Sequence, residues 1–257
     1  MTNGLDIIIT PVNVVWACVA GGFFLLCIPI YLCLRGKDYN QKRKALLVMA
    51  AANLALFCLY LLWFQHIPGR PFFSWDMLPI NLCNLVTIFF VIALATDTRW
   101  LYGFCFYVGV VAGIAAILSP EGGLKEMELF SPLMVGFYFV HCMLYTLGIS
   151  LVSLGLYRPS YKSAFFAVLG LEALTAVIYV ANLVLCNTVY PDANFFFLFT
   201  ADGSPYLEAL HAVVPVPPFT MMASVLPVAL GTFMLLALLY RLFARRNANS
   251  SASSISP

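Results

Sequence analysis

The sequence predicts an all-α integral membrane protein, a polytopic transmembrane bundle of about seven helical spans. Of its 257 residues, 63% are hydrophobic and only 9% are charged. A soluble domain carries about 25% charged residues, so this chain has too little polar surface to cover itself in water. Its apolar residues also form seven segments, each close to the roughly 20 residues that a helix needs to cross a bilayer. The net charge of +2 gives no sign of a nucleic-acid partner.

Polar or helix-breaking residues separate the seven apolar segments. We expect the segments to be helices because irregular backbone cannot face hydrocarbon. The expected spans are approximately 13–34, 44–65, 77–96, 100–118, 131–155, 163–187 and 221–243. They make up one transmembrane domain over residues 1–246, and the polar segment 247–257 is predicted to be a disordered tail.

The first segment is predicted to be a span that is retained, rather than a cleaved signal peptide. A signal peptide begins with basic residues, whereas residues 1–12 contain Asp6 and no Lys or Arg. The nearest basic cluster lies after the segment, within residues 35–44. This arrangement favours an N-terminus outside the cell.

The distribution of basic residues predicts the orientation of the whole chain, because cytoplasmic connections carry an excess of Lys and Arg. With the N-terminus outside and seven crossings, the C-terminus is cytoplasmic and eleven of the thirteen Lys and Arg residues fall inside. Only Arg70 and Lys125 fall outside. The sequence therefore predicts a multi-pass protein of the cell membrane.

The connection formed by residues 188–220 is long and contains five prolines. It also carries the aromatic run Phe195–Phe199, which would not lie comfortably in water. Two interpretations remain open. The segment lies on the membrane surface at the level of the headgroups, or it forms a lid over a cleft that faces the lipid.

The eight cysteines give no sign of a metal or disulfide framework. No pair forms a CxxC motif, and no Cys/His cluster has the spacing of a zinc site. We therefore expect no metal and no cofactor. A buried cysteine in a helix is in general a small apolar packing residue.

Cys83 nevertheless has unusual neighbours, because Asn81 and Asn84 lie one helical turn apart beside it. An amide inside a span is costly unless it finds a partner. One interpretation is hydrogen bonding between helices, which asparagine does well in membranes. The other is a functional site.

His141 is the one histidine inside an expected span, and such an ionisable group is a functional candidate. From the expected span ends, Cys83 lies about 9 Å and His141 about 15 Å from the outer surface, at 1.5 Å rise per residue. Asn182 lies at a similar level. Glu172 is the one acid deep in a span, and Asn53 is its expected partner.

These residues resemble those of the YwaF-type integral membrane proteins, which are bacterial relatives of an animal transmembrane acyltransferase of ether phospholipids. The resemblance covers residues 45–243. It rests on Leu78-Pro79-Ile80-Asn81-Leu82-Cys83, the Pro120 loop, His141, Asn182-Leu183 and the stretch from Asn194 to Ser204. The family pattern often has a histidine where this chain has Asn81, and a tyrosine-containing form of the outer segment.

The resemblance implies a catalytic pair, Cys83 and His141. The thiol would attack the ester of a phospholipid acyl donor, with the imidazole as base. Asn81, Asn84 or Asn182 would bind the oxyanion or the substrate. A lysophospholipid acceptor, or water, would then receive the acyl chain.

Two other classes of function remain open from the sequence. A non-enzymatic permease or substrate-binding membrane subunit would use Asn81, Asn84, Glu172 and Asn182 to line a polar intramembrane path. A membrane scaffold or sensor would need neither a dyad nor a path. A Cys83 sulfur within reach of a His141 ring nitrogen, in a cleft open to the outer leaflet, would favour the enzyme. A cavity that joins both faces and exposes Glu172 would favour the permease.

Overall fold

A computed structural model describes residues 14–65, 75–118, 131–201 and 205–253 of the chain. These residues fold entirely into helices and connections, without a β-strand. Five helices are long and apolar enough to cross a membrane, and two shorter apolar helices accompany them. The expectation of an all-α membrane bundle is thereby confirmed.

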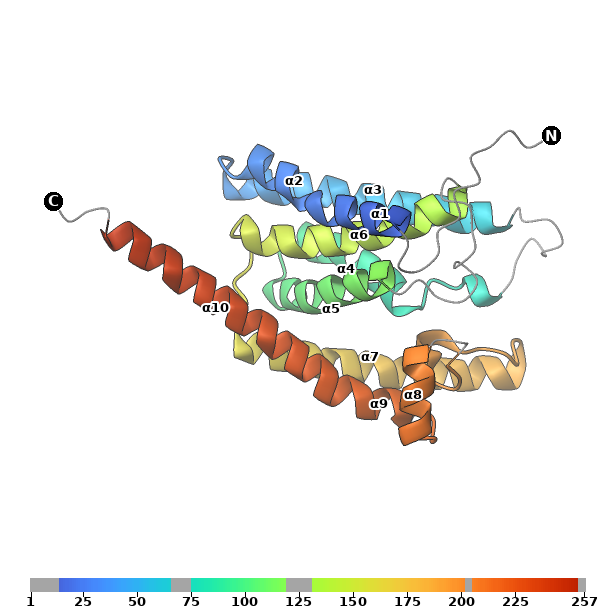
Figure 1. Cartoon of the computed structure of the whole chain (residues 1–257). Helices are drawn as coiled ribbons and strands as arrows, with labels where there is room; N and C mark the ends of the chain where they lie inside the picture. Colours follow the sequence, from blue (N-terminus) through green and yellow to red (C-terminus); the bar gives the residue numbers. More distant parts are fainter. Residues whose placement is uncertain (1–13, 66–74, 119–130, 202–204, 254–257) are drawn as a thin grey trace.

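Four helices agree closely with the expected spans: α3 (Tyr39–Gln65), α5 (Arg99–Leu118), α6 (Pro132–Ser153) and α7 (Tyr161–Thr188). The start of α7 is fixed by a capping box, in which the Ser160 and Ser163 side chains each bond the other residue's backbone N–H. Consecutive long helices run antiparallel (Figure 1).

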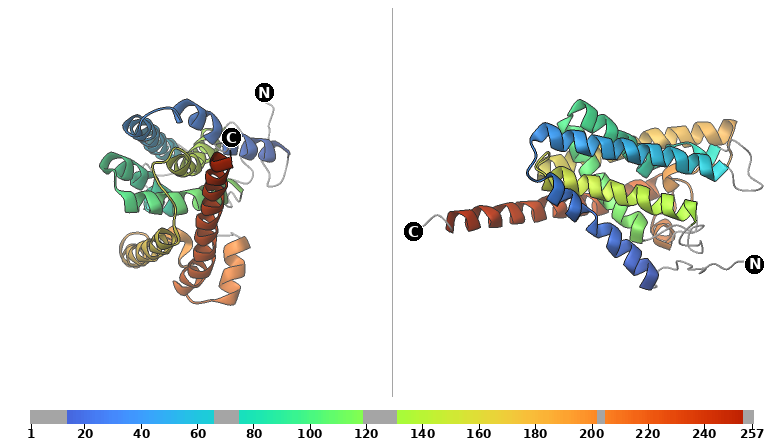
Figure 2. Two further views of the ribbon diagram at one scale, coloured as in Figure 1. Left: turned by 90° about the vertical axis from the view of Figure 1, so that its left-hand side faces the viewer. Right: turned by 90° about the horizontal axis from the view of Figure 1, so that it is seen from above.

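The first and last expected spans are each interrupted. Residues 13–34 contain two helices, α1 (Val14–Leu25) and α2 (Cys27–Leu34), which meet at a bend (Figure 2). The last span consists of α9 (Phe219–Ser224), the π-helical segment η4 (Val225–Ala229) and α10 (Leu230–Ser253). Pro227 accounts for the π-helical turn, because it has no N–H for the α-helical ladder. Helix α10 continues to Ser253, into the segment for which the sequence predicts a tail.

The third expected span, 77–96, is helical only in its second part. A short 3₁₀ helix, η1 (Trp75–Met77), is followed by irregular backbone, and α4 (Leu82–Thr96) begins five residues later. Pro79 explains the break, because it cannot donate a hydrogen bond and it disfavours helical backbone at Leu78. As a result, Cys83 lies in the first turn of a helix rather than inside one.

Helix α5 lies at the centre of the bundle, against α4, α6 and α7. Helix α6 packs on its side nearest α1 and α2, with α3 against α6 and α4, and α7 with α10 packs on the opposite side (Figures 1 and 2). Glycines allow the close approach. A Cβ at Gly148 of α6 would lie 2.6 Å from a methyl carbon of Val110, closer than atoms pack without a shift.

One end of the bundle gathers the connections that carry the basic residues. The carboxylate of Asp97, between α4 and α5, accepts hydrogen bonds from the hydroxyls of Tyr39 (2.5 Å) and Tyr102 (3.0 Å). Arg99 lies over the Tyr39 ring and donates to the backbone oxygen of Leu156 at 2.8 Å. These contacts tie together the starts of α3 and α5 and the connection between α6 and α7.

Candidate functional site

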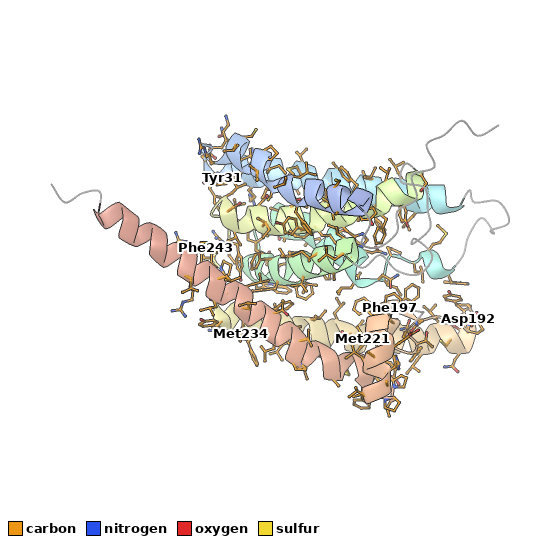
Figure 3. The ribbon with its side chains drawn as sticks, in the orientation of Figure 1. Tyr31, Asp192, Phe197, Met221, Met234 and Phe243 are labelled. Atoms are coloured by element: carbon orange, nitrogen blue, oxygen red, sulfur yellow. The ribbon has the colours of Figure 1, made fainter. Side chains whose placement is uncertain are left out.

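A cavity of about 470 Å³ lies at the other end of the bundle. This volume is within the range of about 300–1,000 Å³ that is typical of small-molecule sites. Phe197 and Met221, two of its lining residues, are labelled in Figure 3. Met221 lies in α9, which packs against α8 (Pro205–Val213). The lining consists of Phe57, Tyr60, Leu61, Met77, Asn81, Leu82, Cys83, Asn84, Ala112, Ala115, Ala116, Phe137, His141, Leu171, Thr175, Phe196, Phe197 and Met221.

Four of the five predicted site residues line this one cavity: Asn81, Cys83, Asn84 and His141. They come from two helices, since the first three lie at the start of α4 and His141 lies in α6. The rest of the lining is almost wholly apolar. The structure therefore brings the candidate thiol and imidazole together with two amides inside an apolar enclosure.

Contacts with α5 place Cys83 and His141 toward the same end of this helix. A Cβ at Gly109 would lie 2.9 Å from the Phe90 ring and 3.4 Å from Val86 of α4, and one at Gly113 would lie 2.8 Å from the backbone oxygen of His141. Because α4 runs antiparallel to α5 (Figure 1), Cys83 lies beyond Val86 in the direction that leads from Gly109 to Gly113. Both residues therefore lie beside the half of α5 that contains Gly113.

The hydrogen bond of His141 determines which ring nitrogen can act as a base. Nδ1 lies 2.7 Å from the backbone oxygen of Phe137. A carbonyl oxygen can only accept, so Nδ1 carries the proton and donates it. In the neutral ring Nε2 then has a lone pair. The Phe137 ring lies against the imidazole, with centroids 4.3 Å apart, and restrains its orientation.

The start of α4 contributes backbone donors to the cavity. Asn81 is the N-cap, and Cys83 and Asn84 are the second and third residues of the helix. The first hydrogen bond of this helix runs from the N–H of Leu85 to the oxygen of Asn81. The N-terminal end of the helix, where backbone N–H groups point along the axis toward the helix start, thus adjoins the cavity lining. Together with the helix dipole, these N–H groups stabilise negative charge at this point.

A short segment forms part of the cavity wall, and we call residues 193–198 the lid. It contains the 3₁₀ helix η3 (Phe195–Phe197), and the Phe195, Phe196 and Leu198 side chains are buried against the ends of α4 and α7. Phe196 and Phe197 line the cavity. Of the two interpretations of this connection, the structure favours the lid over a segment that lies on the membrane surface.

Two of the predicted asparagines hold the lid in place. The side chain of Asn182 donates to the backbone oxygen of Phe195 (2.8 Å) and accepts from its N–H (3.0 Å). The oxygen of Asn81 accepts from the N–H of Phe196 (3.3 Å). Asn182 is fully buried and does not line the cavity. Its amide is therefore placed to position the lid rather than to contact a substrate.

The lid backbone is strained where it enters the cavity. Phe196 and Phe197 adopt φ values of +62° and +53°, in the left-handed region that bulky residues rarely occupy. Such a conformation costs about 1–3 kcal/mol and persists only where the surrounding structure enforces it. Here the hydrogen bonds of Asn81 and Asn182 and the burial of the Phe195, Phe196 and Leu198 side chains hold the backbone.

Glu172 and Asn53 do not form the expected pair. Within the described residues, Oε1 of Glu172 and both polar side-chain atoms of Asn53 are buried without a hydrogen-bond partner. Neither residue lines the cavity. The described part of the chain also brings together no group of three or more His, Cys, Asp or Glu residues that could hold a metal ion.

The prediction from sequence missed the backbone donors of α4 and the positions of Gly113 and Phe196. The sequence does contain a signal for this helix start, because Pro79 followed by Asn81 is typical of a helix that begins at the next residue. The aromatic run 195–199 is visible in the sequence, but its burial is not, because it involves the hydrogen bonds between Asn182 and Phe195. Gly113 had no signal, because its role depends on which helix faces it.

Comparison with protein families identifies a relationship over nearly the whole chain. The model of the TMEM164 family, a family of transmembrane proteins, matches residues 9–240. The match includes every residue of the candidate site. No curated protein and no solved structure matches the chain. By its sequence and its bundle of apolar helices, this protein is a member of the TMEM164 family.

Proposed function

We propose that this protein is a membrane acyltransferase or lipid hydrolase, in which Cys83 and His141 move an acyl chain through a thioester. The observation that carries the proposal is the shared cavity, whose wall includes Cys83, His141 and the N-terminus of α4. Cysteine paired with histidine is a recurrent nucleophile and base.

In the first half of the reaction, Nε2 of His141 takes the proton of the Cys83 thiol. The sulfur attacks the carbonyl carbon of a phospholipid ester, and a C–S bond forms. The oxyanion is stabilised by the N–H groups at the start of α4 and by the side-chain amides of Asn81 and Asn84. The C–O bond then breaks, and His141 returns the proton to the leaving alcohol.

In the second half, His141 takes a proton from the hydroxyl of a lysophospholipid acceptor, or from water. The oxygen attacks the acyl-thioester, the C–S bond breaks and Cys83 is regenerated as a thiol. The apolar lining and the lid favour transfer over hydrolysis, because both restrict the access of water to the thioester.

The permease alternative lacks a comparable observation. Glu172 is absent from the cavity lining, and Tyr39, Asp97, Tyr102 and Arg99 are joined by contacts at the opposite end of the bundle. The lining of the cavity comes from one end of the described helices. We therefore rank the acyl-transfer reaction above a transport path.

The proposed reaction takes place in the outer half of the cell membrane. We infer seven crossings, with the N-terminus outside and the C-terminus in the cytoplasm, counting α1 with α2, α4, and α9 with α10 as one crossing each. The contacts between the basic connections at a single end support this orientation, because positive residues remain on the cytoplasmic side. The cavity then opens at the outer leaflet, where its lipid substrates lie.

The proposal is tested by incubating the purified protein in nanodiscs with phospholipids whose acyl chains are labelled. We expect acyl transfer or release by the wild type, and a loss of roughly a thousandfold or more in Cys83→Ala and His141→Ala, as is typical when a nucleophile or its base is removed. Mass spectrometry should also find a thioester on Cys83 that hydroxylamine cleaves.

A matched control is Cys58→Ala, which removes an exposed thiol of α3 outside the cavity. This variant should keep full activity. A lipid-soluble alkylating reagent should also modify Cys83 faster than Cys58 or Cys105. The proposal fails if folded wild-type protein transfers no acyl chain, or if Cys83→Ala and His141→Ala match it.

A further inference from the structure

Helix α5 changes character where it reaches the cavity. Nearer its start, it buries large side chains such as Tyr102, Phe106 and Tyr107. From residue 112 onward, the cavity wall on α5 is made only of alanines, Ala112, Ala115 and Ala116. Gly113, among them, faces α6 instead. The small side chains are therefore what leaves the space open.

A cavity of this kind is expected to hold a bound molecule. Protein interiors pack at the density of organic crystals, and voids larger than a water molecule are few. An apolar cavity stays dry and binds apolar molecules. In a bilayer, the hydrocarbon chain of a lipid is the abundant apolar molecule. A volume of about 470 Å³ suits one acyl chain better than a complete two-chain phospholipid.

The cavity also provides a route from the lipid to the reacting groups. Ala115 is exposed although it lines the cavity, so the cavity meets the lipid-facing surface of α5 at this residue. Ala112 lies beside Gly113 and hence at the level of His141. A chain that passes Ala115 and Ala112 would bring its ester carbonyl to Cys83.

We propose that the wall formed by Ala112, Ala115 and Ala116 is the binding site for one acyl chain, which enters past the exposed Ala115, and that the size of the Ala112 and Ala116 side chains limits its length. The inference rests on the proposed function and adds its selectivity: the enzyme would choose lipids by acyl chain. The described lining holds no Lys or Arg that could bind a phosphate, which agrees with selection by the chain rather than by the headgroup.

The experiment compares wild type with Ala112→Leu and Ala116→Leu, offered phospholipids with a graded series of chain lengths. Each leucine adds three carbons, so the longest chain transferred should shorten by roughly three methylene groups. Ala112 and Ala116 are half-buried, so Ala115→Leu, at the exposed entry, keeps the test available if the other two variants do not fold. The matched control is Ala176→Leu, an exposed position of α7 beside the lining residue Thr175, which should leave the chain-length profile unchanged.

A second measurement does not depend on turnover. A phospholipid with a photoreactive group at its chain end should crosslink to residues 112–116 in both the wild type and Cys83→Ala, and Ala116→Leu should lose the crosslink. If transfer depends on Cys83 but all three α5 variants keep the wild-type profile, the inference is overturned. If the wild type transfers no acyl chain, the proposed function fails, but the crosslink still tests the acyl-chain site. Labelling at residues 112–116 supports this site, and labelling elsewhere overturns it.

Discussion

Gly113 of α5 lies directly against the backbone of His141 in α6. A Cβ at this glycine would lie 2.8 Å from the oxygen of His141, 3.0 Å from the nitrogen of Tyr145 and 3.1 Å from its Cβ. The first two of these are backbone atoms, which cannot rotate away as the end of a side chain can. The missing side chain of Gly113 therefore sets how closely the imidazole-bearing segment of α6 approaches α5.

We predict that Gly113→Ala displaces His141 and lowers the turnover number by roughly 10- to 100-fold, since a misplacement of about 1 Å can cost that much. The extra methyl group should also destabilise the bundle by about 1–3 kcal/mol. Acyl transfer at saturating lipid measures the first effect, and thermal unfolding in detergent measures the second.

The control for this prediction lies in the same helix pair. Gly148→Ala would place its Cβ 2.6 Å from the Val110 side chain, away from the cavity. This variant should lose stability as well but keep most of its turnover, because a side chain can adjust. Equal losses of turnover in both variants would mean that Gly113 has only a packing role.

Asn182 fixes the lid through both of its polar groups, so its removal should loosen the lid and spare the bundle. We predict that Asn182→Leu leaves the backbone N–H and oxygen of Phe195 unpaired, at about 1–3 kcal/mol for each group that stays buried. Hydrogen exchange of residues 193–198 should rise severalfold, while α5 and α6 exchange as in the wild type.

Asn187→Leu is the matched control for this effect. Asn187 lies on the same helix but is exposed and bonds only to Leu183, within its own turn. Its loss should leave exchange in the lid unchanged. If Asn182→Leu also leaves exchange unchanged, the packing of Phe195 and Leu198 holds the lid without the amide.

The proposed orientation predicts which loops are accessible from each side. In sealed vesicles of known orientation, Asp192→Cys at the lid end should react with a membrane-impermeant maleimide from the outside. Arg158→Cys, between α6 and α7, should react only from the cytoplasmic side. The wild type, with its eight thiols, gives the background. Labelling of both positions from one side would contradict the seven-crossing arrangement.

The sequence predicts the long helices well because hydropathy reports what crosses a bilayer. Helices α3, α5, α6 and α7 end within a few residues of the expected positions. It predicts α4 poorly, because a hydropathy pattern continues through Pro79 although the backbone hydrogen bonding does not. Cys83 consequently lies in a first helical turn instead of a span interior.

The individual site residues could be predicted from the sequence, but their position in one shared cavity could not. Cys83 and His141 stand out through their neighbours, their chemistry and a family resemblance. Whether two helices bring them to one cavity depends on contacts such as Gly109 with Val86 and Gly113 with His141, which lie between segments distant in sequence. Likewise, the polarity of Asn182 is visible in the sequence, but its partner Phe195 is not.

At the opposite end of the bundle, Asp97 forms a cluster whose strength depends on pH. Burial alone would raise the pKa of its carboxyl group, but hydrogen bonds from Tyr39 and Tyr102 and the charges of Arg43 and Arg99 outweigh it and hold the pKa below its ordinary value. In the unfolded chain the pKa is about 3.9. The carboxylate therefore stabilises the folded state above about pH 4, and this stability is lost as the pH falls through the lower, folded-state pKa.

We predict that Asp97→Asn lowers the unfolding temperature at neutral pH. Between about pH 5 and pH 3, the unfolding temperature of this variant should decrease less than that of the wild type, because the amide has no proton to gain in this range. Thermal unfolding in detergent across this range measures both effects. Asp192→Asn, an exposed residue near the lid, serves as the control and should keep the wild-type curve. If the unfolding temperature of Asp97→Asn falls as steeply on acidification as that of the wild type, other carboxyl groups cause the acid sensitivity. The Asp97 cluster would then join the helix ends through packing and the contacts of Arg99 rather than through its charge.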